Sequence, residues 1–264
     1  MSSARSSTGL PIFWKSVQMD RYFDISYELD PAAALRRIDM QVLSGESGYV
    51  CVADGNILQM VHRDAAYREV VDGAMFSICD SSWAPLLLHR LYGIDVPQYC
   101  GSDIFADITA MRRYRQCFLG TSQATLGSLR TKLAQVDPEI AGMTFRELPF
   151  CSVDGFDYAA IAAEVNADSA DIVWVALGAP KQEIFMSRLK PLLKRGVMVG
   201  VGAVFNFRAG TGERRAPQWM IRSHLEFVYR IFQSPGKQLR RCWKIVSAYP
   251  AIYIKEKRMK NGRI

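Results

Sequence analysis

The segment 178–183 reads Gly-Ala-Pro-Lys-Gln-Glu and combines loop-forming residues with an amine, an amide and a carboxylate. It follows an apolar run over residues 172–177, which is typical of a buried parallel strand. Ligands of open α/β sheets bind outside the carboxyl ends of such strands. Lys181, Gln182 and Glu183 are therefore predicted to lie at a site, where the Gln182 amide could both donate and accept hydrogen bonds.

An exposed helix start is the alternative for this segment. Pro180 would then occupy the first turn, and Glu183 would favour the positive end of the helix dipole. The context of Gly178, Pro180 and Lys181 favours the functional interpretation.

A second apolar run, residues 197–205, repeats this plan and precedes Asn206. Gly200 and Gly202 give Gly-x-Gly-x-x-Phe, which lacks the third glycine of a dinucleotide fingerprint, so nicotinamide binding is weakly supported. The pattern still allows the backbone to approach a nucleotide diphosphate closely.

Four motifs carry a resemblance to a known family. They are Gly178-x-Pro180-Lys181-Gln182-Glu183, the run 200–211, Arg215-Ala-Pro-Gln-Trp219-Met220 and Leu225-Glu226-Phe-Val-Tyr229-Arg230. The chain resembles the WecG/TagA/CpsF family of bacterial glycosyltransferases (glycosyltransferase family 26), with order and spacing agreeing over roughly forty-five residues. Weaker matches extend back to about Val50, so the resemblance covers most of the chain.

Asp80 directly follows an apolar run over residues 75–79, a position that suits a general base for an attacking hydroxyl. The alternative is an N-cap for a helix starting near Ser82, and the residues by themselves favour it. The resemblance favours function, because the family places its proposed catalytic Asp at the corresponding position. The family usually continues Asp-Gly, whereas Ser81 follows here.

Three further positions depart from the family or are open to two interpretations. Where the family carries Thr-x-Asn, this chain has Val52-Ala53-Asp54, which would change sugar specificity or weaken activity; a plain turn at Asp54-Gly55 fits equally well. Asn206 stands where the family often has Asp, and an amide cannot act as a base. Gly101-Ser102-Asp103 resembles the family's Gly-Thr/Ser-Asp and is either a donor contact or a helix cap.

Transfer from a nucleotide diphosphate needs positive charge beside the departing diphosphate, from a metal or from fixed cations. No Asp-x-Asp metal motif is present, so Arg215, Arg230, Lys237 and Arg240 are the predicted cations and no metal cofactor is expected. Lys237 and Arg240 follow Arg230 at the spacing of the cations in the family's C-terminal appendage, where the family commonly has Arg at the position of Lys237.

The net charge of +7 is unevenly distributed along the chain. Residues 212–264 hold 13 Lys and Arg against 3 Asp and Glu, which predicts an anionic partner for this segment alone. Anionic lipid, whose attraction is worth ~1 kcal/mol per basic residue, is preferred over a simply solvated basic tail. No nucleic-acid recognition motif is present. The cysteines and histidines show no metal-ligand spacing, and no apolar stretch approaches ~20 residues.

Alternating apolar runs and helical patterns predict a parallel, Rossmann-like α/β domain with helices on both faces. It would span 21–211, between a loosely ordered N-terminus (1–20) and a basic amphipathic helical appendage (212–264). Strands are expected at 49–53, 75–79, 116–119, 172–177 and 197–205, and helices at 32–43, 57–71, 83–92, from 101, 122–135 and 156–165. In the appendage, Leu239, Cys242, Trp243 and Val246 are expected on one face, with Lys237, Arg240, Arg241 and Lys244 largely on the other.

Together, the residues and the resemblance predict an inverting glycosyltransferase. It would move an N-acetylhexosamine or a related sugar from a UDP-sugar to a polyprenyl-diphosphate-linked sugar, for a surface polysaccharide or wall polymer. Asp80 would be the base, Gln182 would position substrate, and Arg230 would stabilise the leaving group. The predicted substrate contacts are Asp54, Gly101, Asp103, Gly178, Pro180, Lys181, Glu183, Gly202, Asn206, Arg215, Lys237 and Arg240.

The enzyme is expected in the cytoplasm, peripheral on the inner face of the cell membrane, and a homo-oligomer is left open. Two other classes remain: a non-catalytic homologue that binds nucleotide sugar or scaffolds an assembly complex, and a nucleic-acid-binding protein that uses the basic tail.

Overall fold

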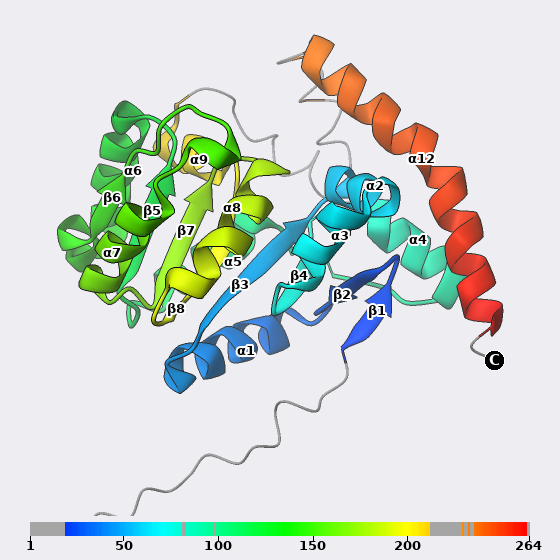
Figure 1. Cartoon of the computed structure of the whole chain (residues 1–264), viewed down its shortest axis with the longest axis horizontal. Coiled ribbons are helices and arrows are strands. Elements are labelled where there is room, and N and C mark those ends of the chain that lie inside the picture. The colour runs from blue at the N-terminus through cyan, green and yellow to red at the C-terminus, as the bar shows by residue number, and fades with distance from the viewer. Residues whose placement is uncertain are drawn as a thin grey trace, which may run out of the picture.

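The computed structural model describes residues 19–80, 83–97, 99–211 and 235–262, together with Tyr229 and Phe232. These residues form one eight-stranded sheet with the order β1-β2-β4-β3-β8-β7-β5-β6 (Figure 1). Only β1 and β2 pair antiparallel. The strands are β1 Asp20–Tyr22, β2 Ile25–Tyr27, β3 Ser47–Ala53, β4 Phe76–Cys79, β5 Gln116–Gly120, β6 Thr144–Arg146, β7 Ile172–Ala176 and β8 Gly196–Gly200.

Helices cover both faces of this sheet, as predicted. One face carries α1 Pro31–Ser44, α5 Gly101–Ala110, α6 Gln123–Val136 and α9 Val204–Ala209. The other carries α2 Gly55–Arg63, α3 Ala65–Asp72, α4 Trp83–Tyr92, α7 Tyr158–Asp168 and α8 Lys181–Leu189. Short 3₁₀ turns lie at Pro138–Gly142, Val153–Gly155 and Lys190–Leu192. The Rossmann-like α/β prediction is confirmed.

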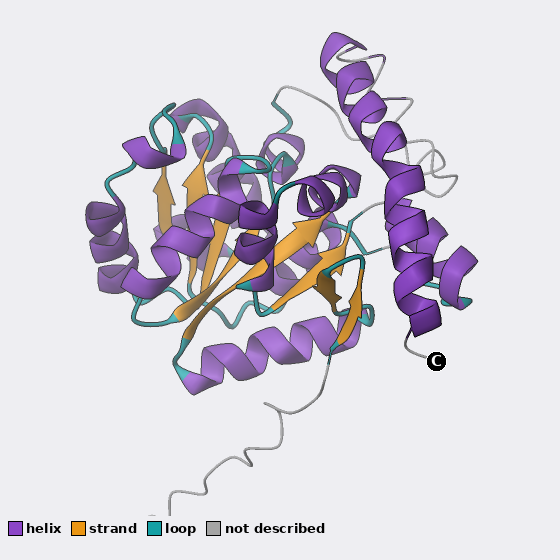
Figure 2. Cartoon of the chain, turned by 45° about the vertical axis from the view of Figure 1, so that its right-hand side comes forward, coloured by secondary structure: helices purple, strands orange, loops and turns teal. Residues whose placement is uncertain are grey.

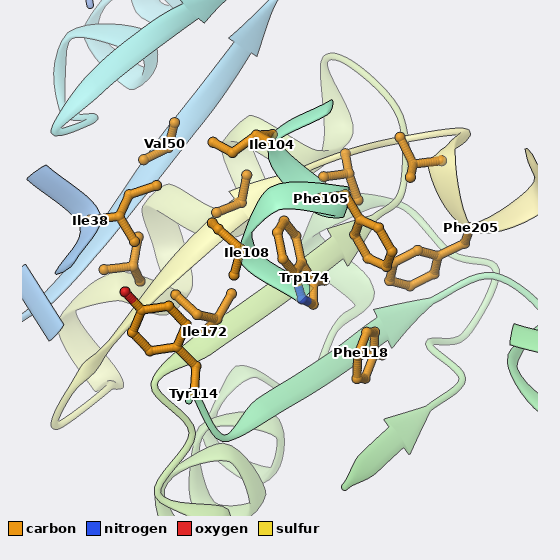
Figure 3. Close-up of a cluster of buried hydrophobic side chains, with 14 of the residues drawn as sticks. Ile38, Val50, Ile104, Phe105, Ile108, Tyr114, Phe118, Ile172, Trp174 and Phe205 are labelled. Carbon is orange, nitrogen blue, oxygen red and sulfur yellow. The ribbon is translucent and has the colours of Figure 1, made fainter. Parts of the chain in front are cut away.

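The central strands are mainly apolar because both of their faces are covered. Figure 3 shows the side packed under α5 and α9, where Phe105 lies against Trp174 with ring centroids 4.7 Å apart. Phe205 approaches Phe105 at 6.1 Å. The Trp174 indole donates its N–H to Gln116 Oε1 (2.7 Å), so this buried polar group is satisfied.

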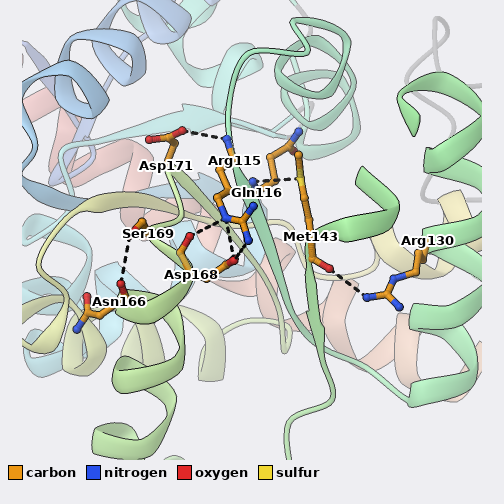
Figure 4. Close-up of polar contacts among 8 residues, drawn as sticks. All are labelled: Arg115, Gln116, Arg130, Met143, Asn166, Asp168, Ser169 and Asp171. Atoms are coloured by element: carbon orange, nitrogen blue, oxygen red, sulfur yellow. Dashed lines mark hydrogen bonds and ion pairs between the residues drawn. The ribbon is translucent and has the colours of Figure 1, made fainter. Parts of the chain in front are cut away.

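Polar contacts tie together the amino ends of β5 and β7, at the edge of the sheet opposite to the loops of interest (Figure 4). Arg115 pairs with Asp168 through its side chain, and its backbone N–H donates to Asp171 Oδ2 (2.9 Å). Arg195, just before β8, also pairs with Asp171. These contacts hold neighbouring strands in register, so that their carboxyl ends finish at a common level.

Several predicted boundaries were wrong for local reasons. The helix expected over 57–71 is broken at Asp64, whose side chain caps α3 by accepting from Tyr67 N. The strand expected over 197–205 ends at Gly200, because Gly202 has φ +55 and α9 starts at Val204. Helix α7 begins at Tyr158, with Asp157 as its cap. Strands β1, β2 and β6 were not predicted, because each has three residues, too few to show an alternation of apolar and polar side chains.

The C-terminal segment described is a single helix, α12 Pro235–Gly262, which continues through Pro250. It lies at the end of the sheet away from β6, beside α2 and α4 (Figures 1 and 2). Ile245, Ala248 and Ile252 are buried against the body, whereas Leu239 and Trp243 are 56% and 73% exposed. The predicted apolar face is therefore the outer face of α12, and a different stripe packs against the protein.

Polar contacts also attach α12 to the body. Glu256 is 1% exposed and accepts from Phe23 N (3.0 Å) and from Tyr92 Oη (2.7 Å). Lys255 pairs with Asp24, and Lys260 Nζ donates to the Leu91 carbonyl (2.6 Å). These two lysines were expected in a solvated or lipid-facing tail, but they serve to hold the helix in place. None of the helices within the described ranges is long and apolar enough to span a bilayer.

Candidate active site

The carboxyl ends of β4, β3, β8 and β7 lie side by side and bring the predicted site residues to one edge. Ala53 and Cys79 are register partners, so Asp54 and Asp80 leave adjacent strands at the same level. The Asp80 N–H donates to the Ala53 carbonyl (3.1 Å). β3 and β8 separate β4 from β7, a distance of about 14 Å at the usual strand spacing. Asp80 and the 178–183 loop therefore flank the central strand ends.

Asp80 is partly buried and faces the start of α5. A Cβ added to Gly101 would lie 3.9 Å from Asp80 Oδ2 and 3.3 Å from Val52 Cγ1, so glycine lets α5 begin close to the carboxylate. Residues 81 and 82, on which the alternative helix-cap interpretation depends, lie outside the described residues.

Asp54 is the N-cap of α2, so the segment Asp54-Gly55 begins a helix and does not form a plain turn. Its Oδ1 accepts from Asn56 N (2.8 Å) and Ile57 N (3.0 Å), and Oδ2 pairs with Arg241 of α12. One carboxylate thus fixes the helix after β3 and brings a guanidinium to the carboxyl edge of the sheet. Arg241 was expected in the basic tail.

Asp103 closes a capping box at the start of α5, where its Oδ2 accepts from Cys100 N (3.0 Å). The helix-cap interpretation of Gly101-Ser102-Asp103 is thus confirmed. The neighbouring Ser102 carbonyl accepts from Arg208 Nη2 of α9 (3.0 Å), so this motif also joins the two helices that face the strand ends.

Helix α8 does start in this segment, at Lys181 with Glu183 in its first turn, but the start is not exposed, because Gln182 is 4% exposed and Glu183 is 0% exposed. Gly178 has φ +76 and its N–H donates to Gln182 Oε1 (3.1 Å). The Gln182 amide lies over the end of β8, where a Cβ on Gly200 would approach its Cδ to 3.1 Å. Glycine at position 200 therefore makes room for Gln182.

Glu183, in the first turn of α8, is fully buried. Its Oε1 accepts from Gln182 Nε2 (2.7 Å) and its Oε2 from Tyr67 Oη of α3 (3.1 Å). Burial raises the pKa of Glu183 and the charge of Asp54 adds to this effect, whereas hydrogen bonds from Gln182, from its own backbone N–H and from Tyr67 oppose it. The result is a pKa of about 7. A carboxyl that changes charge near neutral pH thus lies directly behind Gln182.

This burial predicts that stability falls as pH rises from 4.5 to about 7, the unfolded and folded pKa values of Glu183. Between those values the folded state keeps the proton and the unfolded state has lost it, so raising the pH favours unfolding. The full interval corresponds to on the order of 3 kcal/mol.

Urea unfolding from pH 4 to pH 8 measures this contribution when wild type is compared with Glu183→Gln. The free energy of unfolding of wild type should fall relative to that of the variant as pH rises. Parallel curves for the two proteins would contradict the assignment.

Lys181 and Asn206 have partners within the protein. Lys181 Nζ lies over the rings of Phe156 (4.9 Å) and Phe150 (5.7 Å), toward the connection between β6 and α7. Asn206 Oδ1 accepts from Thr121 Oγ1 (3.3 Å), which joins α9 to the end of β5.

The predicted cations are only partly placed. Arg215 and Arg230 lie outside the described residues, and Lys237 is described only as part of α12. Arg240 is exposed on α12, whereas the next residue, Arg241, reaches the strand ends. Sequence reasoning missed Arg241 and Tyr67. Arg241 could have been found from its helical spacing with Ile245, Ala248 and Ile252. Within the described ranges, no group of three or more His, Cys, Asp or Glu could hold a metal ion.

This geometry can be compared with known proteins. The family described as "Glycosyl transferase WecG/TagA/CpsF family" matches residues 22–263. The chain belongs to this family. It is a glycosyltransferase, as the resemblance implied.

Two curated relatives in the WecG/TagA/CpsF family carry the same descriptive name, N-acetylglucosaminyldiphosphoundecaprenol N-acetyl-beta-D-mannosaminyltransferase. The Bacillus subtilis (strain 168) protein is 26% identical over 220 residues, covering 78% of this chain and 80% of the relative. The protein of Bacillus spizizenii (strain ATCC 23059 / NRRL B-14472 / W23) is 27% identical over 203 residues, covering 74% and 75%.

Proposed function

We propose that this glycosyltransferase moves an N-acetylhexosamine, with N-acetylmannosamine the first candidate, from a UDP-sugar to a polyprenyl-diphosphate-linked sugar during synthesis of a surface polysaccharide or wall polymer. The names of the two relatives support the sugar and the lipid-linked acceptor. The single structural observation that carries the proposal is the alignment of Asp80, Asp54 and the 178–183 loop at one edge of the sheet.

The proposed reaction is a single displacement with inversion. The acceptor hydroxyl oxygen bonds to the anomeric carbon as the bond from that carbon to the UDP oxygen breaks. The hydroxyl proton goes to Asp80, and the bonding electron pair leaves with UDP. Cations stabilise the growing diphosphate charge, and we assign this role to Arg230 with Lys237 and Arg240. Arg241, which pairs with Asp54 at the end of β3, is a further fixed positive charge at this edge of the sheet.

Product analysis tests the assignment. The full chain is incubated with a panel of UDP-sugars and a short-chain lipid-diphosphate N-acetylglucosamine, and the product is examined by mass spectrometry and by NMR at the new anomeric carbon. A β-linked N-acetylhexosamine from an α-linked donor is expected. Binding of UDP without transfer from any donor would favour the non-catalytic homologue, and a product that retains the donor's configuration would exclude single displacement.

Turnover is expected to need no added divalent metal, because arginine and lysine side chains can meet the charge of the leaving diphosphate. The measurement is the transfer rate in excess chelator, followed by addition of Mg²⁺ or Mn²⁺. The chelated enzyme should keep its rate within about twofold of the untreated enzyme. Loss of activity in chelator that either metal restores would contradict this expectation.

The outer face of α12 supports a peripheral membrane location, on the cytoplasmic side where UDP-sugars are made. Leu239, Trp243 and Ile254 are each at least half exposed along this helix, and Arg240 and Lys244 are exposed beside them. An apolar stripe with basic flanks suits a helix that lies in the surface of an anionic bilayer.

Replacing Leu239 and Trp243 together by alanine should therefore weaken vesicle binding roughly tenfold or more, since each buried apolar side chain contributes on the order of 1.5–3 kcal/mol. Co-sedimentation with phosphatidylglycerol-containing vesicles measures this. Leu43→Ala, a similarly exposed leucine on α1, is the matched control and should bind like wild type. Equal binding of the double variant and wild type would remove α12 as the membrane contact.

A further inference from the structure

A chain of three hydrogen bonds runs from α3 to the loop after β7. Tyr67 Oη donates to Glu183 Oε2 (3.1 Å), Gln182 Nε2 donates to Glu183 Oε1 (2.7 Å), and Gly178 N donates to Gln182 Oε1 (3.1 Å). Gln182 and Glu183 are 4% and 0% exposed, and Tyr67 is 4% exposed. A buried network of this kind fixes one arrangement only when each donor meets an acceptor.

The ionised Glu183 carboxylate accepts from Gln182 and from Tyr67 through charge-assisted hydrogen bonds. A proton on Oε2 would donate to the Tyr67 hydroxyl oxygen and would leave Oε1 as a weaker, neutral acceptor for the Gln182 NH₂ group. A proton on Oε1 would face that NH₂ group, donor against donor. The charge of Glu183 is therefore coupled to the strength of the hydrogen bond that orients the Gln182 amide.

We propose that Glu183 and Tyr67 are positioning residues, which hold the Gln182 amide in the one orientation that ties down the Gly178 end of the site. Neither touches substrate; they act through Gln182. This inference rests on the proposed function, because it assigns the 178–183 loop to the donor end of a glycosyltransferase site.

The surroundings of Glu183 set the pH at which this positioning is lost. Tyr67 faces it from α3, Tyr49 and Cys51 from β3, and Asp54 from the cap of α2. Asp54 is itself paired with Arg241. Burial brings the pKa of Glu183 to about 7, so the carboxylate is lost just below neutral pH. The Tyr67 hydrogen bond lowers that pKa, and removing it should move the transition to higher pH.

The first test is the pH profile of kcat for the full chain between pH 5.5 and pH 9. Wild type should be roughly tenfold slower at pH 6 than at pH 8, with a midpoint near pH 7. Glu183→Gln should lack this rise of kcat with pH, because its amide cannot titrate. Tyr67→Phe should move the midpoint of the rise to higher pH. The matched control is Tyr158→Phe, which removes another tyrosine hydroxyl beside α8. That hydroxyl donates to the Val153 carbonyl (2.7 Å) and not to Glu183, so the pH dependence of kcat in this variant should match that of wild type.

The second test needs no turnover. The protein is labelled with ¹⁵N-glutamine, and the Gln182 side-chain amide is assigned by its loss in Gln182→Asn. Its resonances should move with a midpoint near pH 7 in wild type, at higher pH in Tyr67→Phe, and not at all in Glu183→Gln. A Gln182 amide that ignores pH, or that titrates alike in wild type and Glu183→Gln, would overturn the inference.

The two tests separate the two proposals. An amide that titrates as expected, in a protein that transfers no sugar from any UDP donor, would support the positioning chain and count against the proposed function. Sugar transfer with a flat pH profile, together with an amide that does not titrate, would overturn the positioning chain and leave the proposed function standing.

Discussion

Replacing Asp80 by asparagine is expected to lower kcat by roughly 10²- to 10⁴-fold, the usual contribution of a general base. The amide side chain would have nearly the same shape beside Gly101 and could still accept a hydrogen bond, but it could not take the acceptor's proton. UDP affinity, measured by calorimetry, should change little, because the loss falls on the chemical step.

Asp95→Asn is the matched control, since Asp95 is an exposed acid after α4 that pairs with His89. It should turn over like wild type. If Asp80→Asn keeps the wild-type rate, the family assignment survives and Asp80 is not the base.

Replacing Glu256 by alanine is expected to lower the free energy of unfolding by about 2–4 kcal/mol. The substitution removes the acceptor of Phe23 N, which is buried, and of Tyr92 Oη, which is partly buried. It also weakens the attachment of α12, which carries Arg241 to Asp54. Turnover should therefore fall together with stability.

Urea unfolding and kcat/KM on the same preparations measure both effects. Lys257→Ala changes the next residue of α12, which is exposed, and should alter stability by no more than about 0.5 kcal/mol. Wild-type stability in Glu256→Ala would show that α12 is not fixed to the body through this carboxylate. Reduced stability with unchanged turnover would show that α12 does not contribute to the site.

Much of the fold is local in origin and could be predicted. The runs at 49–53, 116–119 and 172–177 are apolar because parallel strands are covered on both faces, and each lies within or close to an observed strand. The helices expected over 32–43 and 122–135 are present as α1 and α6, capped by Asp30 and Ser122. Since strand ends follow from such runs, the placement of Asp54 and Asp80 at one edge was predictable too.

Long-range contacts were not predictable in this way. Helix α12 carries two apolar stripes, and the bulkier one, with Trp243, faces outward because Ala248 and Ile252 fit against the body and Glu256 finds two donors there. The pairing of Asp54 with Arg241 joins residues 187 positions apart.

Glu183 illustrates the same limit within the site. Its position after a proline is typical of an exposed first turn, but in the fold it is buried and bonded to the hydroxyl of Tyr67, 116 residues away, as well as to Gln182. Sequence patterns identify which residues leave a strand end, whereas the partners of those residues depend on the packing of distant helices.

Acceptor-dependent release of UDP tests the central claim most directly. The full chain is given UDP-N-acetylmannosamine, with and without a short-chain lipid-diphosphate N-acetylglucosamine, and UDP is followed over time. Steady release that requires the acceptor, with one new glycosidic bond for each UDP, is the predicted result. Release at the same rate without acceptor, or no release in the presence of both substrates and measurable UDP binding, would contradict a transferase that uses this donor and a lipid-linked acceptor.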